Sequence, residues 1–137
     1  MRLTRRYRFA ASHRLHAPSL SEEANRELYG KCNNPYGHGH DFILEVRVRG
    51  RVDARTGLVV DQGALDALVR RSVLDSFHMK DLNTQVEAFA REAPTSENVA
   101  KEARRRLSGA WRETFGENGA ELEAVRILET SKNEFEA

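Results

Sequence analysis

The feature that most constrains the fold is a stretch of strict alternation between residues 38 and 50. From Phe42 to Val48 every second residue is apolar, and two of the three residues between them are charged. The apolar positions are Phe42, Leu44, Val46 and Val48. Such alternation is typical of a strand with one face on a core and the other in water. This strand needs neighbours in an antiparallel sheet and a layer packed on its apolar face.

Two other stretches predict strands near it. Residues 3–15 are rich in aromatic residues, alternate in part, and carry His13 near their end. Residues 51–60 contain the turn-forming sequence Asp53-Ala54-Arg55-Thr56-Gly57. We expect this segment to return antiparallel to the preceding strand.

A last strand is expected over residues 121–130. It follows the turn Gly116-Glu117-Asn118-Gly119, and its alternation places Glu129 on the same face as Val125 and Ile127. An acidic side chain that closes an apolar face at a strand end is a candidate ligand contact.

Helices are predicted by capping residues and apolar spacing. The first is expected from the serines near residue 21 to Tyr29, where Gly30 ends it. The second begins after Asp61 as N-cap and ends near residue 76. The third begins at Thr95 or Ser96, and its apolar stripe consists of Val99, Ala103, Leu107, Trp111 and Phe115.

These elements predict an α+β fold, in which an antiparallel β-sheet of about four strands has helices packed on one face. No repeat or linker divides the chain, so we expect a single domain over residues 1–137. A sheet of this size leaves exposed edges, which proteins cover or pair. We therefore expect a homo-oligomer.

Composition excludes several classes of protein. The chain has 22 Lys and Arg against 21 Asp and Glu, a net charge of +1, which lacks the basic footprint of a nucleic-acid-binding protein. No apolar stretch approaches the roughly 20 residues that span a bilayer. The single cysteine cannot form an internal disulfide. We expect a cytoplasmic protein with no nucleic-acid or membrane partner.

Histidines suggest a metal site. In His38-Gly39-His40 the period of a strand sends both imidazoles to one face. His13 could supply a third ligand, and three histidines with an open fourth position make a catalytic zinc site. His16 could compete with His13, and Cys32 could be a fourth ligand that makes the site closed and structural. Histidine pairs are also common as surface or hydrogen-bonded side chains.

Four motifs in fixed order carry a resemblance to a known family. They are Phe9-Ala10-Ala11-Ser12-His13-Arg14-Leu15, Cys32 followed by His38-Gly39-His40, Thr95-Ser96-Glu97-Asn98, and Glu129-Thr130. Together they resemble the 6-pyruvoyl-tetrahydropterin synthase family, which includes the 6-carboxy-tetrahydropterin synthases of queuosine biosynthesis. The resemblance covers residues 3–133. Five residues separate Cys32 from His38, which favours the pyruvoyl-forming members of tetrahydrobiopterin biosynthesis over the carboxy-forming ones, where three are typical.

The resemblance implies a substrate, a cofactor and an assembly. The substrate would be 7,8-dihydroneopterin triphosphate, which loses triphosphate and tautomerises to 6-pyruvoyl-tetrahydropterin. The fold would be the tunnelling T-fold, in which the sheets of several subunits form a barrel, commonly in a hexamer with active sites at subunit interfaces. The implied site consists of zinc on His13, His38 and His40, Cys32 as the base, and pterin contacts from Glu129, Thr95 and Ser96.

One stretch departs from the family pattern. The family carries an Asp-His pair in D-H-K-x-L-N, a proton relay to the cysteine, and neither alignment of residues 75–83 keeps this pair whole. One keeps His78 without the aspartate; the other puts His78 in the aspartate slot and Met79 in the histidine slot. Three possibilities follow: His78 acts alone, it acts with Asp75 or Asp81, or the relay is absent. We expect His78 to act as the catalytic acid and base.

Other readings of the sequence stay open. The carboxy-forming reaction would release acetaldehyde together with triphosphate. A pterin-binding or zinc-stabilised protein without activity would need the histidines and Glu129 but not Cys32. Three imidazoles suit zinc best, although other first-row divalent ions would also bind. Arg14 and Lys31 are the nearest candidates for triphosphate contacts by position alone.

Overall fold

A five-stranded sheet forms the centre of the computed structural model, which describes residues 1–117 and 119–137. The strands are β1 (Arg2–His13), β2 (His38–Arg49), β3 (Lys80–Asp81), β4 (Glu121–Leu128) and β5 (Glu134–Glu136). Their order is β3-β1-β2-β4-β5, and every pair is antiparallel except β1 with β3. The predicted α+β class is confirmed.

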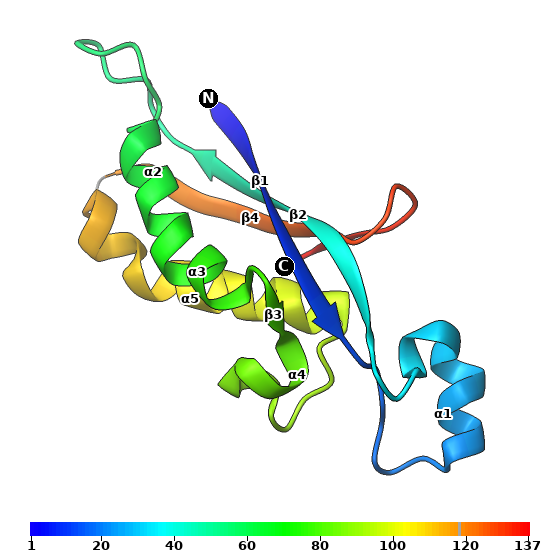
Figure 1. The fold of residues 1–137 in the computed structure, drawn as a ribbon. Coiled ribbons are helices and arrows are strands. Elements are labelled where there is room, and N and C mark those ends of the chain that lie inside the picture. Colours follow the sequence, from blue (N-terminus) through cyan, green and yellow to red (C-terminus); the bar gives the residue numbers. More distant parts are fainter. Residues whose placement is uncertain (118) are drawn as a thin grey trace.

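Helices cover one face of this sheet (Figure 1). The described α-helices are α1 (Glu22–Tyr29), α2 (Gln62–Val69), α3 (Asp75–Phe77), α4 (Leu82–Gln85) and α5 (Ser96–Phe115). A π-helical turn over Arg70–Leu74 joins α2 to α3. The longest helix, α5, runs beneath the sheet with α2 and α3 beside it, whereas α1 lies beyond the end of β1 and β2. None of the described helices is both long and apolar enough to cross a bilayer.

The core lies between the sheet and these helices. The alternating apolar residues of β2 are fully buried, and so are Val99, Ala103 and Leu107 of α5. Phe9 of β1 stacks on Phe42 of β2 with ring centroids 5.0 Å apart. The period of two in the strands and the helical spacing in α5 therefore predict the core-facing sides correctly.

The predicted helix boundaries are confirmed by their caps. Ser21 accepts a hydrogen bond from the Ala24 N–H, Asp61 from the Ala64 N–H, and Thr95 from the Asn98 N–H. Gly30 ends α1 with a φ of 54°, a conformation that glycine adopts without steric cost. The turn predicted at residues 116–119 includes Asn118, which lies outside the described residues.

The strand predicted over residues 51–60 is wrong. Both edges of β2 are already paired, with β1 on one side and β4 on the other. The segment instead forms a loop, in which the Asp53 N–H donates to the Leu58 carbonyl at 2.9 Å. The Asp53 carboxylate accepts from the N–H groups of Arg55 and Thr56. The sequence therefore predicts the turn correctly, but neither edge of β2 is free to pair with a returning strand.

The sheet face away from the helices is charged. Glu45 is buried on this face, with the Arg6 Nε 2.7 Å from its carboxylate and Arg126 on its other side. At the sheet edge, β3 pairs only with Ala11 and Ser12 of β1. Within residues 1–117 and 119–137 the rest of that edge of β1 has no strand beside it. Pairing of sheets between copies stays a prediction.

Candidate metal and substrate site

Four chain segments meet at one end of the sheet. His13, the last residue of β1, is the register partner of His38, the first residue of β2, and His40 lies opposite Ala11. Glu129 directly follows β4, and Pro94 directly precedes the cap of α5. The predicted histidine ligands and pterin contacts come from these segments, because antiparallel pairing brings the end of β1 beside the start of β2 (Figure 1).

The three predicted metal-binding histidines form a compact cluster. The Nε2 atoms of His38 and His40 are 2.7 Å apart. The His13 ring faces both of them, with ring centroids 4.9 Å from His38 and 5.1 Å from His40. The His-x-His pair on one face of a strand is therefore joined by a third imidazole from the neighbouring strand, as the spacing predicted.

His13 has the orientation of a metal ligand. Its Nδ1 donates to the Pro94 carbonyl at 2.7 Å, because a carbonyl oxygen can only accept. Its Nε2 therefore carries a lone pair, and this buried atom has no hydrogen-bond partner among the residues that the structure describes. A backbone carbonyl that fixes the tautomer of a ligating histidine is typical of metal sites. The donor set fits a divalent cation such as zinc.

Electrostatics favour the neutral form of His13 and His38. Burial lowers the pKa of His13, and burial together with the nearby His40 lowers the pKa of His38. The neutral ring is the form that binds a metal.

Cys32 and Glu129 reach the same cluster. The Cys32 Sγ lies 3.6 Å from the His38 Nε2. Glu129 Oε1 lies 3.4 Å from the His13 Nε2 and 3.3 Å from the His40 Nε2. Two groups of ligand atoms thus converge within 4.8 Å of one another, and both include His13. They are His13 with Cys32 and His38, and His13 with His40 and Glu129.

The thiol of Cys32 is protonated more readily than an exposed one. Burial raises the pKa of Cys32, and the negative charge of Glu129 raises it further. The protein groups around it therefore favour the thiol, and the Lys31 side chain is exposed to solvent. A thiolate at this position requires added positive charge in the cluster.

The start of α5 supplies two of the predicted substrate contacts. The Thr95 hydroxyl is used as the N-cap, since it accepts from the Asn98 N–H at 3.3 Å. The Ser96 Oγ is buried and has no partner within the described part of the chain. Ser96 therefore has hydrogen-bonding capacity that the fold itself leaves unused.

His78 lies in a different position from the cluster. It is exposed, and its Nδ1 accepts a hydrogen bond from the Ala10 N–H at 3.1 Å. No hydrogen bond joins it to Cys32 among the described residues. Asp81 is engaged as the cap of α4, where its carboxylate accepts from Asn83 and Thr84. The structure therefore does not pair His78 with Asp81 inside one chain.

A cavity of about 560 Å³ lies between the histidine cluster and the loop after His78. Its lining residues are Ala10, Ala11, Ser12, Gly39, His40, Asp41, Met79, Lys80, Asp81 and Gln85. Met79 and β3 therefore line the same cavity as His40.

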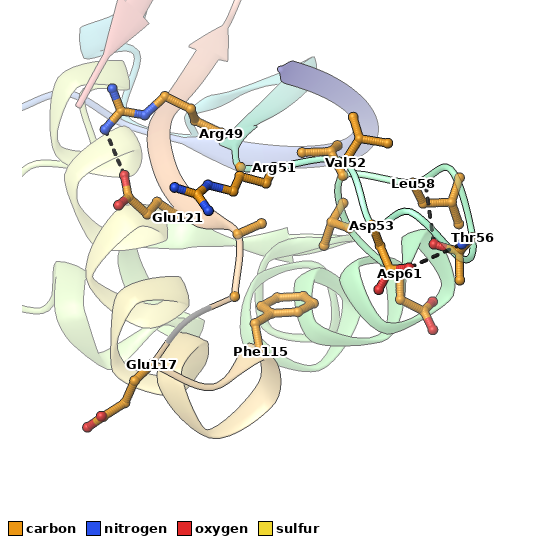
Figure 2. A pocket seen from close by; sticks show the side chains of 15 residues that line it. Arg49, Arg51, Val52, Asp53, Thr56, Leu58, Asp61, Phe115, Glu117 and Glu121 are labelled. Carbon is orange, nitrogen blue, oxygen red and sulfur yellow. Dashed lines mark hydrogen bonds and ion pairs between the residues drawn. The ribbon is translucent and has the colours of Figure 1, made fainter.

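A larger cleft of about 1040 Å³ lies at the opposite end of β2 (Figure 2). Figure 2 shows Arg49 paired with Glu121 there, and the distance between their charged groups is 2.7 Å. No histidine or cysteine is among the residues that line this cleft. Its size therefore does not make it the candidate site.

Sequence reasoning missed two features that shape the site. The Pro94 carbonyl orients His13, yet nothing in a sequence shows which backbone group a distant side chain meets. Gly37 has a φ of 70°, and a Cβ there would lie 2.9 Å from the His13 carbonyl oxygen. A glycine directly before His38 was the available signal for this close approach.

Comparison with known proteins gives relatives over most of the chain. A family model described as 6-pyruvoyl tetrahydropterin synthase matches residues 2–137. The 6-pyruvoyl tetrahydrobiopterin synthase of Drosophila melanogaster is 45% identical over 98 residues, which are 72% of this chain and 58% of the fly protein. A putative 6-pyruvoyl tetrahydrobiopterin synthase of Caenorhabditis elegans is 40% identical over 127 residues, 93% of this chain and 86% of that protein. The chain thus spans somewhat over half the length of the fly relative.

A solved structure of similar fold and a more distant relative complete the comparison. The structure of 6-pyruvoyl tetrahydropterin synthase from Caenorhabditis elegans superposes with a TM-score of 0.89 and 36% identity, covering 100% of this chain and 94% of that one. A 6-carboxy-5,6,7,8-tetrahydropterin synthase of Rickettsia conorii is 26% identical over 115 residues, 73% of this chain and 75% of that protein.

Proposed function

The chain belongs to the 6-pyruvoyl tetrahydropterin synthase family and has the T-fold of its members, and from this premise we propose that it is a zinc-dependent lyase. Its substrate is 7,8-dihydroneopterin triphosphate, and its product is 6-pyruvoyl-tetrahydropterin. The relatives with 40–45% identity carry the corresponding name.

The observation that carries this proposal is the convergence of three imidazoles, one thiol and one carboxylate at one end of the sheet. The lone pair of the buried His13 Nε2 faces the other two histidines. His13, His38 and His40 would hold the zinc ion. When bound, the ion supplies Lewis acidity toward the hydroxyl groups of the substrate side chain, which acidifies the adjacent C–H bonds.

Cys32 is the base in this proposal. The thiolate removes a proton from a carbon of the substrate side chain, triphosphate leaves, and tautomerisation gives the dicarbonyl product. The Cys32 Sγ lies 3.6 Å from the His38 Nε2, so the thiol borders the proposed metal centre. The positive charge of the ion would offset the burial and the carboxylate that raise the pKa of Cys32.

Glu129 and the start of α5 hold the pterin. The 2-amino group and the N3–H of the pterin present two parallel donors, which one carboxylate accepts as a fork. The Glu129 carboxylate lies beside His13 and His40 and can accept both of these hydrogen bonds. Ser96 is buried with an unused hydroxyl near Pro94, which suits a hydrogen bond to the ring, and Thr95 lies next to it.

His78 carries the proton to and from Cys32 only if another copy of the chain brings it there. Within one chain it bonds to Ala10 on the edge of β1, whereas the open edge of β1 allows sheets to pair between copies. We therefore propose a homo-oligomer, a hexamer by the family resemblance, with sites at subunit interfaces. A cytoplasmic location is part of the proposal, because a reducing compartment keeps Cys32 as a thiol.

Product analysis on 7,8-dihydroneopterin triphosphate, together with metal analysis of the purified protein, tests the proposal. We expect about one zinc ion per chain and formation of 6-pyruvoyl-tetrahydropterin with release of triphosphate. Acetaldehyde with 6-carboxy-tetrahydropterin would instead assign the carboxy-forming reaction. Pterin binding without turnover, unaffected by Cys32→Ala, would assign a binding protein, and a protein free of bound metal would overturn the proposed chemistry.

A further inference from the structure

His16 and Asn33 form a hydrogen-bonded pair beside the metal-binding cluster. Asn33 is only 5% exposed. Its Nδ2 donates to the Leu15 carbonyl at 2.7 Å and meets the His16 Nδ1 at 3.1 Å. Because the Leu15 carbonyl can only accept, it fixes the orientation of the amide, and His16 Nδ1 must be the acceptor of the second bond.

The same two segments are joined by backbone contacts at Cys32. The Leu15 N–H donates to the Cys32 carbonyl at 2.7 Å. The Arg14 Nε donates to the Asn33 carbonyl at 3.2 Å. Four hydrogen bonds thus tie the residues that follow His13 to the turn that carries Cys32. His13 supplies one imidazole of the cluster, so this network sets the distance between the cluster and the thiol.

His16 takes no direct part in the cluster. It is absent from both groups of converging ligand atoms found in the described residues. Its Nδ1 is occupied by Asn33. His16 therefore either stabilises the turn that carries Cys32 or is a surface residue without a specific role.

We propose that His16 and Asn33 are positioning residues that hold the Cys32 thiol against His38. The importance of this positioning for catalysis rests on the proposed function. The positioning of the thiol itself can be tested without it. His16 acts through Asn33, and Asn33 acts through the backbone of the turn. Neither residue touches the substrate.

Alkylation by iodoacetamide tests the positioning directly, because Cys32 is the only cysteine in the chain. The variants are His16→Leu, which removes the acceptor, and His16→Gln, whose side-chain oxygen can replace it. His16 is half-buried, so both substitutions are compatible with folding. We expect His16→Leu to raise the alkylation rate about fivefold, the effect of one lost hydrogen bond of ordinary strength. His16→Gln should stay within about twofold of the parent protein.

Asn33→Ala and Asn25→Ala are the second pair of variants, a test and its matched control. Asn33→Ala removes the donor to the Leu15 carbonyl. We expect the alkylation rate of Cys32 to rise on the order of tenfold. Asn25 is a buried amide in the same segment between β1 and β2, but among the described residues its side chain bonds only to Ala17, Leu20 and Ser21. Asn25→Ala should therefore lower the melting temperature without changing the alkylation rate of Cys32. Circular dichroism reports whether each variant is folded.

Three outcomes would overturn the proposal. They are equal alkylation of His16→Leu and the parent, equal alkylation of His16→Leu and His16→Gln, and an increase in Asn25→Ala as large as in His16→Leu. The expected kinetic result is a lower kcat for His16→Leu with KM and zinc content unchanged. If the parent protein proves to have no lyase activity, the proposed function fails, whereas the alkylation series still decides the positioning.

Discussion

His13 and His38 are direct register partners across β1 and β2, and their imidazole centroids are 4.9 Å apart. The same register runs along both strands without a shift, from Arg2 opposite Arg49 to His13 opposite His38. A shift of one residue would turn every side chain of β1 to the other face. The buried apolar face of the sheet thus fixes the register, and the register builds the site.

Replacing His13 by alanine should abolish stoichiometric metal binding. His13 belongs to both groups of converging ligand atoms, so its loss weakens either arrangement. We expect zinc affinity to fall at least about 100-fold, since even an outer-shell partner contributes 10- to 100-fold. Equilibrium dialysis with elemental analysis measures it. His78→Ala is the matched control, because His78 lies outside the cluster, and it should keep its zinc. Retention of full affinity in His13→Ala would contradict the assignment.

Glu129→Gln should weaken pterin binding while leaving the metal in place. The amide can accept only one of the two parallel donors of the pterin, and its own NH₂ group opposes the other. Loss of one charge-assisted hydrogen bond predicts an increase in Kd of about 10- to 100-fold. Fluorescence titration with dihydroneopterin provides the value. If zinc is lost together with the pterin, Glu129 is a metal ligand instead of the pterin anchor.

The sequence predicted the clustering of the three histidines better than the edges of the sheet. Alternation in β2 and the position of His13 at the end of β1 are local signals, and together they place three imidazoles on one face. The strand predicted at residues 51–60 failed because a strand needs a free edge, and only the whole topology shows that β1 and β4 occupy both edges of β2. β5 was missed because three residues carry too little periodicity to be recognised.

His78→Asn should reduce turnover with little change in stability. The asparagine oxygen can still accept from the Ala10 N–H, so the bond at the edge of β1 is kept. The amide cannot transfer a proton, and we expect kcat to fall on the order of 100-fold. Steady-state kinetics with parallel thermal unfolding measures both effects. Undiminished turnover would remove His78 from the mechanism.

Met79 should tolerate glycine better than valine. Within the described chain it is the one non-glycine residue with positive φ, at 57°, and it is 74% exposed. Its N–H donates to the Ala10 carbonyl at 2.6 Å, which holds the loop against β1. We expect Met79→Gly to stabilise the protein by about 0.5–1 kcal/mol and Met79→Val to destabilise it by about 1–2 kcal/mol. Urea unfolding gives both values, and the reverse order would show that packing, not backbone conformation, governs this position.

Asp66 should stabilise the fold in a pH-dependent way. Its carboxylate receives a fork from Arg5 at 2.5 and 2.7 Å and a hydrogen bond from the Tyr7 hydroxyl at 2.8 Å, which join α2 to β1. The Arg5 guanidinium lowers the pKa of Asp66. A group whose folded pKa is depressed stabilises the protein above its unfolded pKa, about 3.9 for aspartate, and loses that contribution as the pH falls through the folded value.

Asp66→Asn should therefore destabilise the protein at pH 7 by about 1 kcal/mol, since the pair is partly exposed to solvent. The difference from the parent should shrink as the pH falls from the unfolded aspartate pKa of about 3.9 toward the lowered folded value, so it should be smaller at pH 3 than at pH 7. Urea unfolding at both pH values measures it, with the exposed Glu27→Gln as a control that should show little difference at either. A loss of the same size at pH 7 and at pH 3 would mean that the shape of the carboxylate, and not its charge, joins the helix to the sheet.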